Sequence, residues 1–74
     1  MKDKLRHIWQ EVLSLEEAPK DDESFFDLGG NSYLSSKAVQ AISEEFGKPM
    51  NVSDMYEYDT ISAQAEFLGK ADTE

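Results

Sequence analysis

The chain is organised around the stretch Phe25-Phe26-Asp27-Leu28-Gly29-Gly30-Asn31-Ser32, which joins a long loop to a helix. The loop, residues 16–31, is long for a small domain, in which connections usually have about 4–6 residues. Phe25, Phe26 and Leu28 argue against disorder because they can pack onto a core. The glycine pair that follows them permits a sharp turn and a close approach by another protein. The stretch therefore predicts an ordered, functional loop that leads into a helix.

The helix after this loop is expected to run from Ser32 to Phe46. Asn31 suits its N-cap, Gly47 suits the position after its last turn, and Pro49 prevents it from continuing. Helical periodicity places small and apolar residues on one face. This predicted buried face consists of Ser35, Val39, Ile42 and Phe46.

The segment before the loop is predicted to be an amphipathic helix from Lys2 to Leu15, ended by residues 16–19 with their Pro19. His7 lies on its solvent side, away from the apolar face. That face consists of Leu5, Ile8, Trp9 and Val12, with Leu15 at its edge. From the helices and the loop, the residues assigned to the core rather than to function are Trp9, Phe26, Leu28, Val39 and Ile42.

The segment after the second helix is expected to form a short helix within Met50–Tyr56 and then a last helix. Asp59 or Thr60 can cap that helix, and Gly69 is expected to end it. Its apolar stripe is Ile61, Ala65 and Leu68, with Phe67 at the flank. No run alternates with period two for long enough to predict a strand. The fold class is therefore all-α, a small bundle of three principal helices and one short helix.

Length and charge limit the possible functions. Seventy-four residues form one domain, residues 1–74, and the absence of Cys excludes a disulfide framework, a thiolate metal site and a catalytic cysteine. The net charge of −9, carried mainly by residues 16–31 and by the C-terminal third, residues 48–74, argues against nucleic acid or an anionic membrane as a partner and favours basic protein surfaces. No apolar run is long enough for a membrane span and no signal-peptide core is present, so a cytoplasmic protein is expected.

Ser32 is the residue on which chemistry is expected, although the chain offers it no catalytic machinery. Gly30-Asn31-Ser32-Tyr33-Leu34 is not a nucleophile elbow, and the single His lies on the solvent face of the first helix. Gly47-Lys48 and Gly69-Lys70 lack the remainder of a phosphate-binding loop. The acidic loop does not match a calcium loop. We therefore expect no catalytic residue and no metal site.

The sequence resembles a known family at two places. Residues 25–32 are similar to the phosphopantetheine-attachment signature of carrier proteins, and Leu28-Gly29-Gly30 resembles peptidyl carriers of nonribosomal peptide synthesis more than fatty-acid carriers. Met55-Tyr56-Glu57-Tyr58-Asp59-Thr60-Ile61 resembles the hydrophobic–aromatic–Glu–x–Pro–Thr–Ile stretch of the family. Three positions depart from the usual pattern: Asp59 stands for Pro, Asn31 for Asp or His, and Tyr33 for Leu or Met.

The resemblance implies an acyl-carrier-like four-helix bundle and a carrier function. Ser32 would accept 4′-phosphopantetheine from coenzyme A through a separate phosphopantetheinyl transferase. The arm would bring the thiol that the chain lacks, holding an aminoacyl or peptidyl group as a thioester. An adenylating enzyme would load it, and condensation, tailoring or thioesterase enzymes would act on it. The protein itself is expected to be a non-catalytic monomer.

The surface beside Ser32 is expected to contact these partner enzymes. Tyr33 and Lys37 point roughly 160° away from the buried face of their helix, and Asn31 and Leu34 flank the modified residue. Two other functions remain open. One is an acyl carrier for polyketide or fatty-acid chemistry, and the other is a helical interaction module without a prosthetic group.

Overall fold

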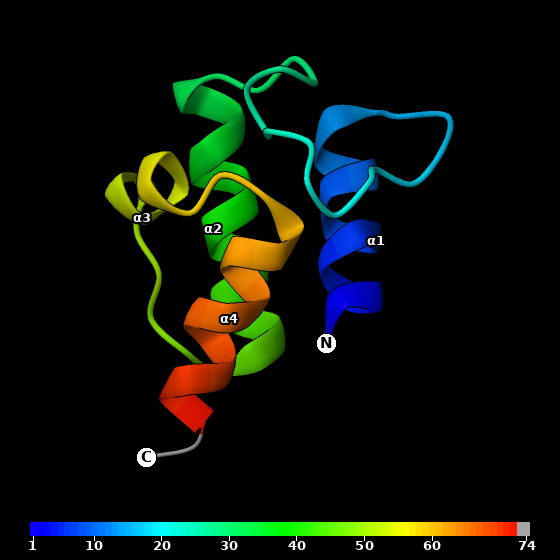
Figure 1. The fold of residues 1–74 in the computed structure, drawn as a ribbon. Helices are drawn as coiled ribbons and strands as arrows, with labels where there is room; N and C mark the ends of the chain where they lie inside the picture. The colour runs from blue at the N-terminus through cyan, green and yellow to red at the C-terminus, as the bar shows by residue number, and fades with distance from the viewer. Residues whose placement is uncertain (73–74) are drawn as a thin grey trace.

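A computed structural model describes residues 1–72 of the chain as four helices with no strand among them (Figure 1). The α1 helix spans Lys2–Leu13, α2 spans Ser32–Phe46, α3 spans Val52–Glu57 and α4 spans Ile61–Asp72. The α2 helix contacts both α1 and α3, and α1 also contacts α4. The all-α class and the order of three longer helices and one short helix are as the sequence predicts. None of the helices within residues 1–72 is both long and apolar enough to cross a membrane.

The α1 helix ends earlier than the sequence predicts. Its last helical residue is Leu13, and Ser14 adopts a left-handed conformation with φ 56°. The N–H of Leu15 bonds to the carbonyl of Gln10 at 3.0 Å, and that of Ser14 bonds to the carbonyl of Glu11 at 3.4 Å. These two bonds form a Schellman motif, which satisfies the terminal carbonyls before the chain reaches Pro19. The expected end at residues 16–19 was therefore wrong.

The second helix begins and ends where the sequence predicts. The side chain of Asn31 accepts a hydrogen bond from the Leu34 N–H at 2.9 Å, and Gly47 ends the helix in the left-handed region with φ 66°. On the inner face Ser35, Ala38, Val39 and Ile42 are buried, whereas Phe46 is only half-buried.

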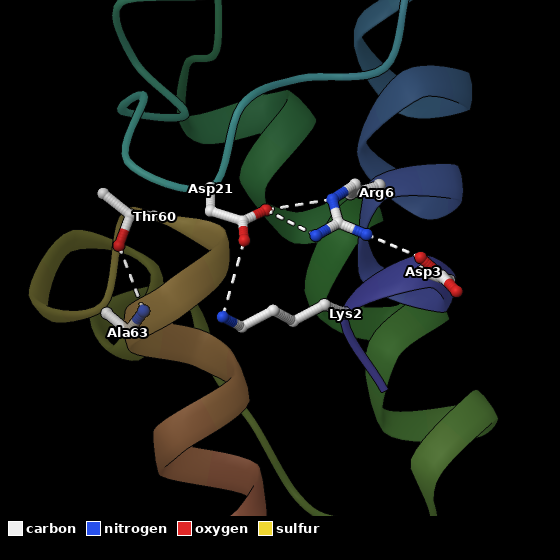
Figure 2. Close-up of polar contacts among 6 residues, drawn as sticks. All are labelled: Lys2, Asp3, Arg6, Asp21, Thr60 and Ala63. Carbon is white, nitrogen blue, oxygen red and sulfur yellow. Dashed lines mark hydrogen bonds and ion pairs between the residues drawn. The ribbon is translucent and has the colours of Figure 1, made fainter.

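The last two helices are each capped by the side chain of the residue that precedes them. Asn51 and Asp54 form a reciprocal capping box at the start of α3. At the start of α4, Thr60 Oγ1 accepts from the Ala63 N–H at 3.1 Å, so Thr60 caps this helix (Figure 2). Gly69 does not end α4, which continues to Asp72, because its backbone is not in the left-handed region that closes a helix.

The core contains one of the loop aromatics. Phe25 is fully buried, and its ring meets that of Trp9 edge to face at a centroid distance of 5.0 Å. Phe26 and Leu28, which the sequence assigned to the core, are only partly buried and pack against its outside. The fully buried large side chains are Leu5, Trp9, Phe25, Ile42, Met55, Ile61, Leu68 and Gln64.

Gln64 is a polar residue inside this apolar core, and its amide is satisfied there. Its Oε1 accepts from Trp9 Nε1 at 3.0 Å, and its Nε2 donates to the carbonyl of Tyr58 at 2.8 Å. The Trp9 bond links α1 to α4, and the Tyr58 bond links α4 to the end of α3. Because an unpaired buried amide costs free energy, both bonds favour this packing of the helices.

An ion-pair cluster fastens the loop to α1 (Figure 2). The guanidinium of Arg6 donates to Asp21 Oδ1 from Nε at 2.9 Å and from Nη2 at 2.7 Å. Lys2 Nζ lies 3.4 Å from the other oxygen of this carboxylate, and Arg6 also binds Asp3. The Arg6 hydrogen bonds lower the pKa of Asp21 below its ordinary value of 3.8.

Candidate functional site

Ser32 is exposed at the first position of α2, where the long loop meets the helix. The cap at Asn31 fixes its backbone, because the Asn31 carbonyl also accepts from the Ser35 N–H at 2.8 Å. The Ser32 hydroxyl is thus presented to solvent from a capped helix end. An exposed hydroxyl in this position is accessible to another protein.

The glycine pair shapes the approach to this position. Gly29 adopts φ +105°, a conformation that L side chains rarely take. A Cβ on Gly30 would collide with the ring of Phe25, and the Gly30 N–H donates to the Phe25 carbonyl at 3.0 Å. The sequence suggested that the glycine pair lets another protein approach closely. At Gly30 the group that approaches closely is instead Phe25, a residue of the same loop.

The Ser32 hydroxyl has a partner that the sequence did not indicate. Its Oγ lies 2.9 Å from the hydroxyl oxygen of Tyr56 on α3, and either group can donate. The Tyr56 ring stacks on that of Phe26, with centroids 4.6 Å apart and planes 8° from parallel. The resemblance covered Tyr56 as the family's aromatic position, but nothing in it pointed to the hydroxyl.

The residues predicted to contact partners separate into two groups. Tyr33 is 65% exposed, and Lys37 Nζ lies 5.0 Å above the centre of its ring, so these two form one exposed surface beside Ser32. Asn31 is exposed but its side chain is engaged in the cap, and Leu34 is partly buried against the core. Tyr33 and Lys37 are therefore the more accessible pair.

The structure gives Ser32 no imidazole base. His7, the single histidine of the chain, is exposed on α1, with Nε2 3.5 Å from a Glu11 carboxylate oxygen. Within residues 1–69, whose side chains the structure describes, no three His, Cys, Asp or Glu side chains gather in a way that would hold a metal ion.

Comparison with known proteins assigns the family. A family model described as "Phosphopantetheine attachment site" matches residues 3–68, nearly the whole chain. The chain belongs to this family. The phosphopantetheine cofactor that the sequence predicted is therefore confirmed at the level of the family, and so is the carrier-protein resemblance.

Relatives of this carrier domain are large biosynthetic enzymes. A protein of Salinispora arenicola named "Probable non-canonical nonribosomal peptide synthetase (NRPS) CymA" is 34% identical over 73 residues, which are 99% of this chain and 1% of that protein. Malformin synthetase mlfA of Aspergillus brasiliensis is 38% identical over 68 residues, 90% of this chain and 1% of that synthetase. Polyketide synthase PksN of Bacillus subtilis is 34% identical over 68 residues, 92% of this chain and 1% of that synthase. The chain thus spans a very small part of the length of these relatives.

Solved structures agree with the fold. The structure of McyG A-PCP complexed with phenylalanyl-adenylate matches with a TM-score of 0.85 and 25% identity, covering 90% of this chain and 10% of that one. BlmI, a type-II acyl-carrier-protein from Streptomyces verticillus involved in bleomycin biosynthesis, matches with a TM-score of 0.87 and 21% identity, over 95% of this chain and 83% of that one. The acyl-carrier-like fold is confirmed.

The site fits the cofactor of the family. The Ser32 hydroxyl is exposed, and the N-terminus of α2 lies here with N–H groups and a dipole that favour a negatively charged group. The Tyr56 hydroxyl adds a hydrogen-bond donor beside the Ser32 oxygen. Ser32 therefore has both the accessibility and the polar surroundings that a phosphate ester needs.

Proposed function

We propose that residues 1–74 form one carrier domain and that Ser32 is its attachment point for 4′-phosphopantetheine. A separate phosphopantetheinyl transferase would use coenzyme A as donor. The bond from Ser32 Oγ to phosphorus forms while a P–O bond of the coenzyme A diphosphate breaks. Adenosine 3′,5′-bisphosphate leaves, and the Ser32 proton passes to a base of the transferase.

The observation that carries this proposal is the placement of Ser32. The loop signature of the family folds so that its serine lies exposed at the first residue of α2, while Phe25 anchors the same loop in the core. The chain's own part is to hold this hydroxyl rigidly and accessibly. The domain is non-catalytic in this proposal, since modification and loading are carried out by other enzymes.

The cargo we propose is an aminoacyl or peptidyl group, held as a thioester on the thiol that the arm supplies. Support comes from a relative named as a nonribosomal peptide synthetase and from the likeness to the A-PCP complexed with phenylalanyl-adenylate. An adenylating enzyme would load the arm, and condensation, tailoring or thioesterase enzymes would act next. Tethering raises the effective concentration of the cargo at each of these enzymes.

The surface through which the domain meets these enzymes is centred on Tyr33 and Lys37 in this proposal, with Asn31 and Leu34 beside them. The acidic loop supports partners with basic surfaces, because opposite charges accelerate encounter. We place the domain in the cytoplasm, as a monomer, where coenzyme A and the transferase act on it.

A second candidate cargo is an acyl group of polyketide chemistry. It is favoured by the 34% identity to polyketide synthase PksN over 92% of the chain. The Leu28-Gly29-Gly30 run favours the peptidyl carrier instead. The family match favours either carrier over a helical interaction module without a prosthetic group.

Intact-mass spectrometry tests the proposal. The protein is incubated with coenzyme A and a promiscuous phosphopantetheinyl transferase, with Ser32→Ala as the control. We expect the wild type to gain the mass of one phosphopantetheine group and the control to gain none. No gain on the wild type, or a gain on Ser32→Ala, overturns the assignment of Ser32. Amino acids and acyl donors offered with their activating enzymes then distinguish the two cargoes.

A further inference from the structure

Tyr56 joins the short α3 helix to the attachment point on α2. Although it lies 24 residues further along the chain, its hydroxyl oxygen is 2.9 Å from Ser32 Oγ. This distance is that of an ordinary O–H···O hydrogen bond. A side chain of α3 is thus already in contact with the oxygen that would be modified.

The position of Tyr56 is fixed by an aromatic stack. Its ring lies on Phe26 with planes 8° apart, and Phe26 in turn meets the ring of Phe25 edge to face at 5.5 Å. Phe25 is fully buried, so the stack is anchored in the core. Tyr56 is nevertheless 54% exposed. The stack therefore holds an accessible phenol beside Ser32 at little further cost in conformational entropy.

Attachment changes the hydrogen-bonding chemistry of Ser32 Oγ. The free hydroxyl can donate to Tyr56 or accept from it, whereas an ester oxygen has no proton to donate. The two non-bridging oxygens of a phosphodiester are acceptors that share a negative charge, and each is two covalent bonds from Ser32 Oγ. A hydrogen bond from a hydroxyl to an ionised oxygen is stronger than one between neutral groups. The phenol therefore has a better acceptor after modification than before it.

We propose that Tyr56 is a binding residue for the phosphate of the prosthetic group. Its hydroxyl donates a hydrogen bond to a non-bridging phosphate oxygen on Ser32 and fixes the root of the arm against α3. This inference rests on the proposed attachment at Ser32. It also makes α3 responsive to modification, because the same hydroxyl exchanges one partner for another.

Tyr56→Phe tests the inference because it removes only the hydroxyl and keeps the ring that stacks on Phe26. Tyr58→Phe is the matched control, since Tyr58 lies two residues away and stacks on Phe67 instead. Both variants and the wild type are first converted with coenzyme A and the transferase, and intact mass confirms the modification. Failure of the wild type to gain mass contradicts the proposed function itself, before Tyr56 is examined.

Phosphorus-31 NMR of the modified proteins then reads the phosphate directly. We expect its resonance to shift in Tyr56→Phe relative to the wild type and to stay unchanged in Tyr58→Phe. We also expect attachment to move the amide resonances of residues 55–57 in the wild type and to move them less in Tyr56→Phe. A phosphorus resonance that is the same in all three modified proteins overturns the inference while leaving Ser32 as the attachment point.

A measurement on the wild type alone covers the case in which Tyr56→Phe does not fold. The chain has three tyrosines, so labelling with tyrosine enriched in ¹³C at Cζ gives a simple spectrum. Attachment should shift the Cζ resonance of Tyr56 and leave that of Tyr58 in place. Unchanged positions for both resonances also overturn the inference.

Discussion

The hydroxyl of Ser24 donates a hydrogen bond of 2.7 Å to the carboxylate of Asp59. The carbonyl of Asp59 accepts a second bond, also of 2.7 Å, from the N–H of Phe25. The long loop is thereby fastened to the connection between α3 and α4. The family usually has proline at position 59. Because proline has no side-chain carboxylate, the hydrogen bond from Ser24 depends on the Asp59 of this sequence.

Asp59→Ala is expected to destabilise the domain by loosening this attachment. A hydrogen bond to a charged group contributes about 1.5–3 kcal/mol, and partial exposure places the expected loss near the lower end. Urea unfolding of Asp59→Ala, Ser24→Ala and the double variant gives the coupling free energy between the two side chains. Strictly additive losses would show that the bond contributes nothing.

Gly30→Ala is expected to distort the loop before Ser32, because the new methyl group would occupy space held by the ring of Phe25. Overpacking of this kind costs roughly 1–3 kcal/mol. The matched control is Gly69→Ala in α4, where an added Cβ meets no atom within 4 Å. That substitution should stabilise the helix by about 0.5–1 kcal/mol. Thermal unfolding checks both, and equal midpoints for the two variants would contradict the collision with Phe25.

The sequence predicted the second helix to the residue because its ends carry strong local signals, the Asn31 cap and Gly47. Local signals failed where a longer-range contact decided the outcome. Phe25 and Phe26 have the same side chain, but it is Phe25 whose ring packs on the buried Trp9 and is itself fully buried. The end of α1 depended on Ser14 taking a left-handed conformation, which is uncommon for a residue other than glycine.

In the candidate site too, residues marked by local signals were predicted, whereas a contact between separate helices was not. A local motif identified Ser32, and helical periodicity put Tyr33 and Lys37 on the exposed side, where the structure has them. Tyr56 was missed as a site residue because its contact with Ser32 depends on how α3 packs beside α2. The resemblance marked position 56 as aromatic but gave no indication of this contact.

Acid is expected to weaken the cluster around Asp21. Hydrogen bonds from Arg6 lower the pKa of Asp21 in the folded state below its unfolded value near 3.8. Between these two pKa values the unfolded chain therefore binds more protons than the folded chain, and a fall in pH favours unfolding. This contribution to stability is fully present above the unfolded pKa and is lost as the pH falls through the folded pKa.

Thermal unfolding of the wild type and Asp21→Asn from pH 7 to pH 2 measures this contribution. The midpoint of the wild type should exceed that of Asp21→Asn at neutral pH, and the difference should shrink below pH 3.8. Added salt should also reduce the difference at neutral pH, since these charges are partly exposed. A difference that does not change with pH would exclude the Arg6–Asp21 pair as its source.

Tyr33→Ala is expected to slow phosphopantetheine transfer without altering the fold. The side chain is 65% exposed and adjacent to Ser32, so its removal leaves the core intact, and surface substitutions usually change stability by less than about 0.5 kcal/mol. An aromatic anchor at a protein interface contributes on the order of 1–2 kcal/mol, which corresponds to roughly a 5–30-fold loss in kcat/KM of the transferase for this substrate.

Initial rates measured by intact mass over a range of carrier concentrations separate KM from kcat in this experiment. Because Tyr33 is proposed to contact the partner rather than the reacting oxygen, the loss should be mainly in KM. Lys37→Ala is the companion variant, since its ammonium lies over the Tyr33 ring and its removal should give a smaller loss of the same kind. If Tyr33→Ala is modified at the wild-type rate, this surface is not part of the transferase interface. A loss confined to kcat would indicate that Tyr33 acts on Ser32 itself.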